Sequence, residues 1–514
     1  MNGCIMANRK QKALKNIIIA FFSNILTYLL SLFTSKIIKE KLGLDILGLN
    51  GVLTNIISIL SLTELGVGSA ITFALYEPLV HNNKELINSI MDFYKRTYRI
   101  IALLVAVIGL LLLPVIPLFI KGSLFSKKYL FIVYLLFLLN SVLSYLLIYK
   151  RTLIVADQRN YIVTTVTLFY TYALKIFQLV AVFFTSNYIL FLLIQIICTL
   201  IYNLIISFIC DKLYPFLKAP SKKLDQEYYQ IIIKKIKALF FHSIGSVIVL
   251  GTDNILISYF CGITEAGRYT TYLSIINMIG TIIILVFHTL RDTLGNFLVT
   301  ETKERKRHLF HNLVFINQTL VSIFSICLVL LLTPFIQIWF GQDTVLPNYI
   351  VIIMIFCFYF QKNMLCVGSM KTAAGLFEQD KFVPIYESCV NLVASILLAK
   401  KFGIIGIVLG TIISTLSGPF LFQAIIVFKN IFNENPIKYF ITFGTYFFRF
   451  VFVLLITKYF FNHVIKFVPT NISNFFVEAV FIFIFVSILW FFTVFWKQEF
   501  KYFIVMIKNR IVKK

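Results

Sequence analysis

Long apolar segments recur from one end of this chain to the other, and each is close to the length of about 20 residues that an α-helix needs to cross a bilayer. Hydrophobic residues make up 59% of the 514 residues, charged residues only 13%, and the mean hydropathy is +0.90. Soluble domains carry about 25% charged residues. The sequence therefore predicts an all-α polytopic membrane protein.

The hydropathy pattern predicts fourteen transmembrane helices, an even number that places both termini on one side. The first follows the basic stretch MNGCIMANRKQKALKN, which lacks a small-residue cleavage site, so we expect this helix to be retained rather than removed as a signal peptide. The predicted spans cover residues 14–35, 50–72, 100–120, 129–149, 161–183, 187–210, 237–260, 270–292, 309–333, 348–366, 381–399, 404–428, 438–461 and 475–496.

The basic residues are distributed unevenly between the two sides that these spans define. With the N-terminus inside, 34 of the 47 Lys and Arg residues fall in inner segments and 11 in outer loops, while Lys175 and Arg449 lie within spans. Cytoplasmic loops carry an excess of Lys and Arg, so both termini are predicted to be cytoplasmic. The net charge of +25 is attributed to this topology and to anionic lipid, because no nucleic-acid-binding module is visible.

The second half of the chain repeats features of the first. LGLDILG at 42–48 aligns with CGITEAG at 261–267, an offset of 219, and ADQRNY at 156–161 aligns with FEQDKF at 377–382, an offset of 221. LLLLPVIPLF at 110–119 aligns with LLLTPFIQIW at 330–339 between them. Six spans separate the copies, so the halves are predicted to be parallel repeats around a central cavity, a plan of transporters. The predicted parts are an N-terminal lobe (1–210), a cytoplasmic linker (211–236), a C-terminal lobe (237–428), and two further helices with a basic tail (438–514).

Polar and ionisable residues inside the spans indicate the functional site. Such residues are costly in lipid, so they face the bundle interior and often mark a substrate or ion path. Residue spacings of three, four and seven place many of them on single helix faces in spans 1, 2, 5, 7 and 8. Candidates for substrate binding are Lys175, Arg291, Asn24, Asn55, Asn277 and Arg449, and candidates for ion coupling are Glu64, Asp253 and His242.

Each candidate has a structural alternative. Glu64 could pair with an inner-leaflet Lys or Arg, and Asp253 with Asn254 could bind a cation or pair with Lys175. His242 could be a core histidine, and Arg291 could form a salt bridge with Asp292. Arg449 could pack against the last span or meet a lipid head group, and Glu387 and Asn391 share a face of span 11.

Several classes of chemistry have no support in the sequence. The eight cysteines lie mostly in apolar runs without CxxC spacing, which indicates core residues rather than disulfides or a metal site. No HExxH and no P-loop occur, and no loop is large enough for a catalytic domain. We therefore expect neither an enzyme nor a cofactor.

The segments KLGLDILGLNGVLTNIISILSLTELGVGSAI, ALYEPL and GTDNILIS resemble polysaccharide-transport proteins of the multidrug/oligosaccharidyl-lipid/polysaccharide exporter superfamily, in particular flippases of lipid-linked oligosaccharides. The resemblance implies two six-helix lobes, alternating access and a cationic cavity, in which Lys175 and Arg291 would engage anionic groups. Relatives that flip lipid-linked cell-wall precursors use several arginines on the first helices of the lobes, and spans 1, 2 and 7 here have none.

The function expected from this resemblance is the flipping of undecaprenyl-pyrophosphate-linked oligosaccharide units across the bacterial cytoplasmic membrane, for capsule, exopolysaccharide or O-antigen assembly. Expected partners are that substrate, membrane lipids and polysaccharide polymerase or assembly proteins, without nucleic acid. The alternatives are a drug or cation antiporter of the same fold, a polysaccharide polymerase or ligase, and a non-transporting scaffold. Protonation of Glu64 or Asp253 would couple a proton gradient to transport.

Overall fold

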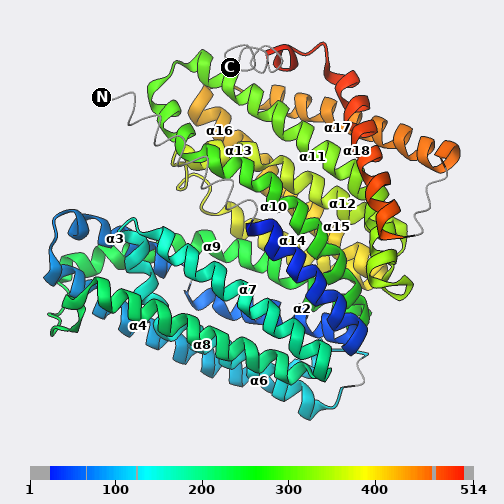
Figure 1. Cartoon of the computed structure of the whole chain (residues 1–514). Helices are drawn as coiled ribbons and strands as arrows, with labels where there is room; N and C mark the ends of the chain where they lie inside the picture. Colours follow the sequence, from blue (N-terminus) through cyan, green and yellow to red (C-terminus); the bar gives the residue numbers. More distant parts are fainter. Residues whose placement is uncertain (1–22, 65, 123–124, 466–470, 503–514) are drawn as a thin grey trace. The chain divides into compact units, whose positions relative to one another are not determined.

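The computed structural model describes residues 23–64, 66–122, 125–465 and 471–502, except for the side chains of residues 63, 147, 238–239, 241–244, 246, 250, 288–293 and 465. This described part is helical, and it contains no β-strand (Figure 1). It includes eleven helices long and apolar enough to cross a membrane, together with three shorter apolar helices over Leu44–Leu60, Val67–Val80 and Val247–Cys261. The prediction of an all-α polytopic membrane protein is therefore confirmed.

Two compact units are present, one comprising residues 1–270 with Pro384–Ser388 and the other Thr271–Val383 with Cys389–Lys514. The lobe boundaries derived from the repeat remain a prediction, because internal contacts and sequence repetition are different criteria. The first unit holds a helix over 23–42, α2 (Leu44–Leu60), η1 (Ser61–Glu64), α3 (Val67–Val80), α4 (Lys84–Leu112), η2 (Leu113–Val115), α5 (Ile116–Phe119), α6 (Lys127–Ala156), α7 (Asn160–Thr185), α8 (Tyr188–Leu213), η3 (Pro215–Lys218), α9 (Gln226–Cys261) and the start of α10 (Ile263–Thr300).

The second unit continues along α10 and contains the helices that follow it. These are α11 (Lys303–Phe340), η4 (Gln342–Thr344), α12 (Asn348–Asn363), α13 (Leu365–Ala373), α14 (Val383–Phe402), α15 (Ile404–Thr415), η5 (Leu416–Phe420), α16 (Leu421–Val427), η6 (Phe428–Phe432), α17 (Ile437–Phe460), η7 (Phe461–Ile465) and α18 (Ile472–Val494). Helix α11 packs on α12 and α18, and α12 packs on α15. Residues 384–388 of α14 belong to the first unit.

The single span predicted over 50–72 is wrong. The chain forms α2, then the 3₁₀ turn η1, and resumes a helix only at α3. Gly66 has φ +84° and caps α3 in the left-handed conformation, which interrupts a continuous α-helix. Hydropathy continues across this break, so the apolar pattern alone gave no sign of it. Glu64 is the last residue of the 3₁₀ turn.

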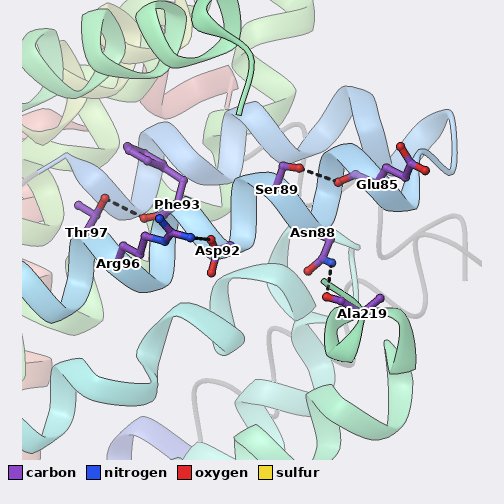
Figure 2. Close-up of polar contacts among 8 residues, drawn as sticks. All are labelled: Glu85, Asn88, Ser89, Asp92, Phe93, Arg96, Thr97 and Ala219. Carbon is purple, nitrogen blue, oxygen red and sulfur yellow. Dashed lines mark hydrogen bonds and ion pairs between the residues drawn. The ribbon is translucent and has the colours of Figure 1, made fainter. Parts of the chain in front are cut away.

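The segment between α8 and α9 packs on α4 within the first unit. Asn88 of α4 donates a hydrogen bond from Nδ2 to the carbonyl oxygen of Ala219 at 2.9 Å (Figure 2). The Phe93 ring meets the Tyr229 ring edge-on at 5.6 Å. The predicted linker 211–236 contains the last residues of α8, the turn η3 and the first residues of α9.

The sequence repeat has a backbone counterpart in the first unit. Gly43 and Gly262, at the offset of 219, have φ angles of 88° and 100°, which an L-residue with a side chain rarely adopts. The Gly43 N–H donates to Lys39 O at 3.0 Å and the Gly262 N–H donates to Ser258 O at 3.1 Å. Each glycine directly precedes a helix, α2 or α10. The two copies therefore make the same turn with the same hydrogen bond.

The helices that follow these turns touch at the second pair of repeated glycines. A Cβ atom on Gly48 would lie 2.1 Å from the carbonyl oxygen of Ile263, and one on Gly267 would lie 2.4 Å from the carbonyl oxygen of Leu44. Leu44 and Ile263 also differ by 219, so the contact is reciprocal. Thr264 donates a hydrogen bond to Asp45 at 2.6 Å beside it. Only glycine allows this approach of α2 and α10.

Replacing Gly267 by Ala is expected to destabilise the protein by about 1–3 kcal/mol, because the added methyl group overpacks a backbone contact. The matched control is Gly444→Ala, since a Cβ atom there meets nothing within 4 Å and α17 is helical around it. That control should be neutral or stabilising by up to about 1 kcal/mol. Denaturation of the purified variants in detergent measures both, and equal midpoints would contradict the close packing.

Candidate functional site

Glu64 is held by phenol groups from two neighbouring helices. Its Oε1 accepts a hydrogen bond from the Tyr98 hydroxyl of α4 at 2.5 Å, and its side chain also bonds to Tyr145 of α6. Tyr145 bonds further to Ser61 and Ser141. In the described part of the chain no Lys or Arg makes an ion pair with Glu64, so the alternative of a basic structural partner is absent from this network.

The surroundings of Glu64 are aromatic, and Glu64 itself is half-buried. Tyr94 and Tyr98 are each 1% exposed, and their rings meet edge-on at 4.7 Å. Tyr149 contacts Tyr94 and Tyr145 contacts Tyr98 in similar edge-on geometry. A carboxylate that receives two phenol hydrogen bonds in such a site can exist in the protonated or the ionised form. We call these residues, with Glu64, the Glu64–tyrosine cluster.

A polar pocket of about 210 Å³ lies between α6, α7 and α8, helices that run side by side (Figure 1). Its lining combines amide, hydroxyl, phenol and guanidinium groups with two isoleucines. The lining residues are Asn140, Ser144, Ile148, Arg151, Tyr170, Thr199, Tyr202, Asn203 and Ile206. We call it the α6–α8 pocket.

Most of the polar groups around the α6–α8 pocket already have partners. The Tyr170 hydroxyl bonds to Thr199 at 3.2 Å, and Asn203 Nδ2 donates to Leu143 O at 3.1 Å. Asn140 Oδ1 is different, because it is buried without any hydrogen-bond partner. An unsatisfied buried oxygen is costly. It therefore offers an acceptor to a donor on a bound ligand.

Sequence reasoning missed the α6–α8 pocket because it looked for the site on spans 1, 2, 5, 7 and 8, whereas most of the pocket lining comes from α6 and α8. The signal was present in two i, i+4 pairs, Asn140 with Ser144 and Thr199 with Asn203. This spacing places both members of a pair on one helix face. A polar pair on one face of an otherwise apolar helix predicts an internal polar surface.

Lys175 lies near the middle of α7, half-buried, and makes no ion pair with any residue in the described ranges. Nearby hydroxyls of the predicted stripe bond to their own helix, as Thr171 Oγ1 donates to Thr167 O at 2.8 Å. Gln178 is 1% exposed and donates to Phe191 O at 3.3 Å. Lys175 is thus a membrane-depth cation that is not neutralised by a carboxylate.

Asp253 and Asn254 face the start of α10. Tyr269 donates a hydrogen bond to Asp253 Oδ2 at 3.1 Å, and Thr270 donates to Asn254 Oδ1 at the same distance. Asn254 is 5% exposed. Asp253 and Lys175 do not form an ion pair in the described structure, so the suggested pairing between them is not observed.

The remaining candidates are dispersed. Asn24 and Asn277 are exposed and Asn55 is half-buried. Arg449 is half-buried with its guanidinium 5.6 Å from the Tyr446 ring centre, and its Nη1 is buried without a hydrogen bond. The side chains of Arg291 and His242 lie outside the described residues.

Two lysines of the second unit lie on helices α12 and α13. Lys362 is near the end of α12, and its Cε would lie 2.7 Å from a Cβ atom on Gly280, so that glycine provides its space. Lys371 of α13 forms an ion pair with Asp380, and both are buried. Lys362 makes no ion pair within the described residues and is a second candidate cation, whereas Lys371 is neutralised.

Comparison with known proteins places this arrangement in one fold. No family model matches the chain, and no curated protein sequence matches it. A solved structure described as lipid II flippase MurJ, inward closed conformation, is similar over 92% of this chain and 98% of its own, with a TM-score of 0.65 and 15% identity.

MATE transporters are similar over somewhat less of the chain. An inward-facing multidrug resistance MATE family transporter of the MOP superfamily matches 78% of this chain and 94% of its own, with a TM-score of 0.59 and 14% identity. A MATE transporter from Vibrio cholerae matches 83% of this chain and 98% of its own, with a TM-score of 0.56 and 14% identity. The chain thus has the fold that MurJ and MATE transporters share, as the fold prediction implied.

Proposed function

We propose that this protein is a flippase that moves a lipid-linked oligosaccharide, carried on undecaprenyl pyrophosphate, across the bacterial cytoplasmic membrane by alternating access. The fold supports a transporter, since the solved structures that share it are a flippase and drug transporters. The resemblance of residues 37–76 and 237–260 to polysaccharide-transport proteins supports the saccharide substrate. Capsule, exopolysaccharide or O-antigen assembly would use the product, together with a polymerase.

The observation that carries the substrate class is the α6–α8 pocket. Its amides and hydroxyls suit sugar hydroxyl groups, which both donate and accept hydrogen bonds. The tyrosine rings supply the apolar surface that a sugar face also needs. Arg151 lines the pocket, and Lys175 lies on α7 outside the lining. These two cations would favour the anionic pyrophosphate.

A drug or cation antiporter is the second candidate, and one observation favours it. The Glu64–tyrosine cluster is aromatic and acidic, the combination that binds cations. The Glu64 carboxylate is already bonded to a tyrosine hydroxyl, whereas the α6–α8 pocket has room for a ligand. We therefore assign substrate contact to the pocket and proton coupling to Glu64.

The test is reconstitution into liposomes with a fluorescent or lectin-detectable lipid-linked oligosaccharide. The wild type is expected to expose the glycan on the opposite leaflet, and a lipophilic cation such as a rhodamine should not be exported. Export of the cation without glycan flipping would instead support the antiporter. Absence of both activities, with normal insertion, would support a scaffold.

Pocket variants sharpen this test. Asn140→Leu and Thr199→Val are each expected to slow flipping by about three- to tenfold, because each removes one hydrogen-bonding group worth about 0.5–1.5 kcal/mol. Thr165→Val is the matched control, since the Thr165 hydroxyl bonds to its own helix at Tyr161 O and lies outside the pocket lining. Equal rates in all three variants would remove the pocket from the substrate path.

A further inference from the structure

A second cavity, in the second unit, has no part in the function proposed above. It has a volume of about 300 Å³ and lies between the first turns of α11, the turn η6 and the start of α17. Its lining residues are Arg307, Phe310, His311, Val314, Phe428, Glu434, Lys438, Tyr439, Ile441 and Thr442. This end of α11 follows the basic segment 291–307, which the charge distribution predicts to face the cytoplasm.

The floor of this cavity is a rigid aromatic cluster. Phe310 is 2% exposed and contacts Phe428 at 5.5 Å and Tyr439 at 6.1 Å between ring centres. Phe428 also contacts Tyr439 at 5.9 Å. Aromatic side chains packed in this way have little freedom to collapse. The cavity is therefore a preformed feature of the fold.

The rim of the cavity carries more positive than negative charge. Arg307 and Lys438 contribute cations, His311 adds an imidazole, and Glu434 is the acidic group in the lining. Glu434 Oε1 is shared between Arg307 at 3.3 Å and Lys303 at 3.6 Å, so two cations divide one carboxylate. Lys438 is exposed and makes no ion pair within the described residues. An anion would complete this set.

The flank of the cavity is apolar and exposed. Ile441 lines it and is 61% exposed, and Ile437, one helical turn earlier on α17, is 56% exposed. On a helix that is apolar enough to cross the membrane, such side chains face acyl chains. The ligand that matches both rim and flank is an amphiphile with an anionic head and an apolar chain.

Two other occupants fit less well. The C-terminal residues beyond 502 include Lys508, Arg510, Lys513 and Lys514 and no acidic residue, so their charge has the same sign as the rim. A saccharide repeat unit fits less well here than in the α6–α8 pocket, because the lining has no amide side chain to pair with sugar hydroxyl groups. A phosphate ester head group suits both the charge and the size.

We propose that this cavity binds the head group of an anionic phospholipid of the cytoplasmic leaflet, with an acyl chain along Ile437 and Ile441. Arg307 and Lys438 engage the phosphate, and Thr442 and His311 add hydrogen bonds. Basic pockets between transmembrane helices on the cytoplasmic side are suited to such lipids. The inference is independent of the transported substrate.

Native mass spectrometry of the full chain, released from nanodiscs of phosphatidylglycerol and phosphatidylcholine, tests the proposal. The wild type is expected to retain phosphatidylglycerol. The double variant Arg307→Gln with Lys438→Gln should bind phosphatidylglycerol with an affinity about fivefold lower for each cation removed. Arg305→Gln with Lys306→Gln is the charge-matched control, because it removes the same total charge from residues next to Arg307 on α11 that lie outside the cavity lining. Equal retention by the two double variants would overturn the proposal.

Two further arms keep the result interpretable. Thr442→Phe fills the cavity without changing charge and should also reduce retention, which separates the cavity from general surface attraction. Soluble glycerol 3-phosphate should fail to displace the lipid, since it lacks the chain that packs on Ile441. Displacement by this soluble phosphate, or unchanged retention in a folded Thr442→Phe variant, would overturn the lipid assignment.

Discussion

Replacing Asp380 by Asn is expected to destabilise the protein by about 3–5 kcal/mol, because it leaves the Lys371 ammonium buried without its counter-ion. Lys371 is 5% exposed and Asp380 is 1% exposed, so water cannot take over the role of the lost carboxylate. An effect of this size is a large fraction of the stability of most proteins. Titration with sodium dodecyl sulfate of the protein in mild detergent, followed by tryptophan fluorescence, measures it.

Two controls separate the buried charge from a general loss of an acidic residue. Lys371→Met combined with Asp380→Leu removes both charges and should recover most of the lost stability, since a buried pair is often replaceable by apolar residues. Glu85→Gln removes a carboxylate whose partner Lys222 is exposed, and it should change stability by at most about 1 kcal/mol. A single Asp380→Asn variant as stable as the wild type would contradict the burial of this pair.

The Lys371–Asp380 pair also has a counterpart in the first unit. Lys150 lies 221 residues before Lys371, the offset found for the aligned loops that follow them. Lys150 pairs with Asp211 of α8 at 2.7 Å, whereas Lys371 pairs with an acidic residue nine positions later. Both halves thus keep a lysine at the matched helix position but neutralise it from different elements. We infer that these two lysines stabilise the bundles rather than bind substrate.

The fold could be predicted from sequence because bilayer-length apolar helices leave few alternatives. Aligned sequence segments also identified the repeat, and the glycines at offset 219 mark equivalent turns in the structure. Hydropathy could not locate the break after Glu64, because it is averaged over the apolar residues on both sides of the short turn Ser61–Glu64 and contains no information on backbone dihedral angles. Backbone conformation at such a site is set by tertiary packing.

The candidate site was less predictable than the fold. Sequence identifies which residues are ionisable at membrane depth, but their partners come from other helices. Glu64 finds two tyrosines rather than a cation, and Asp253 finds Tyr269. The roles of the predicted site residues therefore remain predictions, while the α6–α8 pocket enters only through the structure.

Replacing Glu64 by Gln is expected to abolish the response of transport to a proton gradient while the protein stays folded. Glutamine keeps an oxygen that accepts the hydrogen bonds of Tyr98 and Tyr145, so the cluster can remain packed. It cannot gain or lose a proton. When transport is coupled to one proton, a difference of one pH unit changes the equilibrium ratio of substrate across the membrane by about a factor of ten. The variant should lose this effect.

The measurement is the initial rate of glycan flipping in liposomes with an imposed pH difference of one unit in each direction. The wild type should respond to the sign of the gradient, and Glu64→Gln should give the same rate in both directions. Glu85→Gln serves as the matched control, since it removes an exposed carboxylate of α4 outside the cluster and should respond like the wild type.

Tyr98→Phe tests whether the hydrogen bond to Glu64 matters for coupling rather than for packing alone. It removes the donor at 2.5 Å but keeps the ring that contacts Tyr94. We expect a gradient response that persists but is displaced along the pH axis, because a donor to a carboxylate favours its ionised form. A Glu64→Gln variant that still distinguishes the two gradient directions would assign coupling to another residue, and Asp253 would then be the next carboxylate to replace.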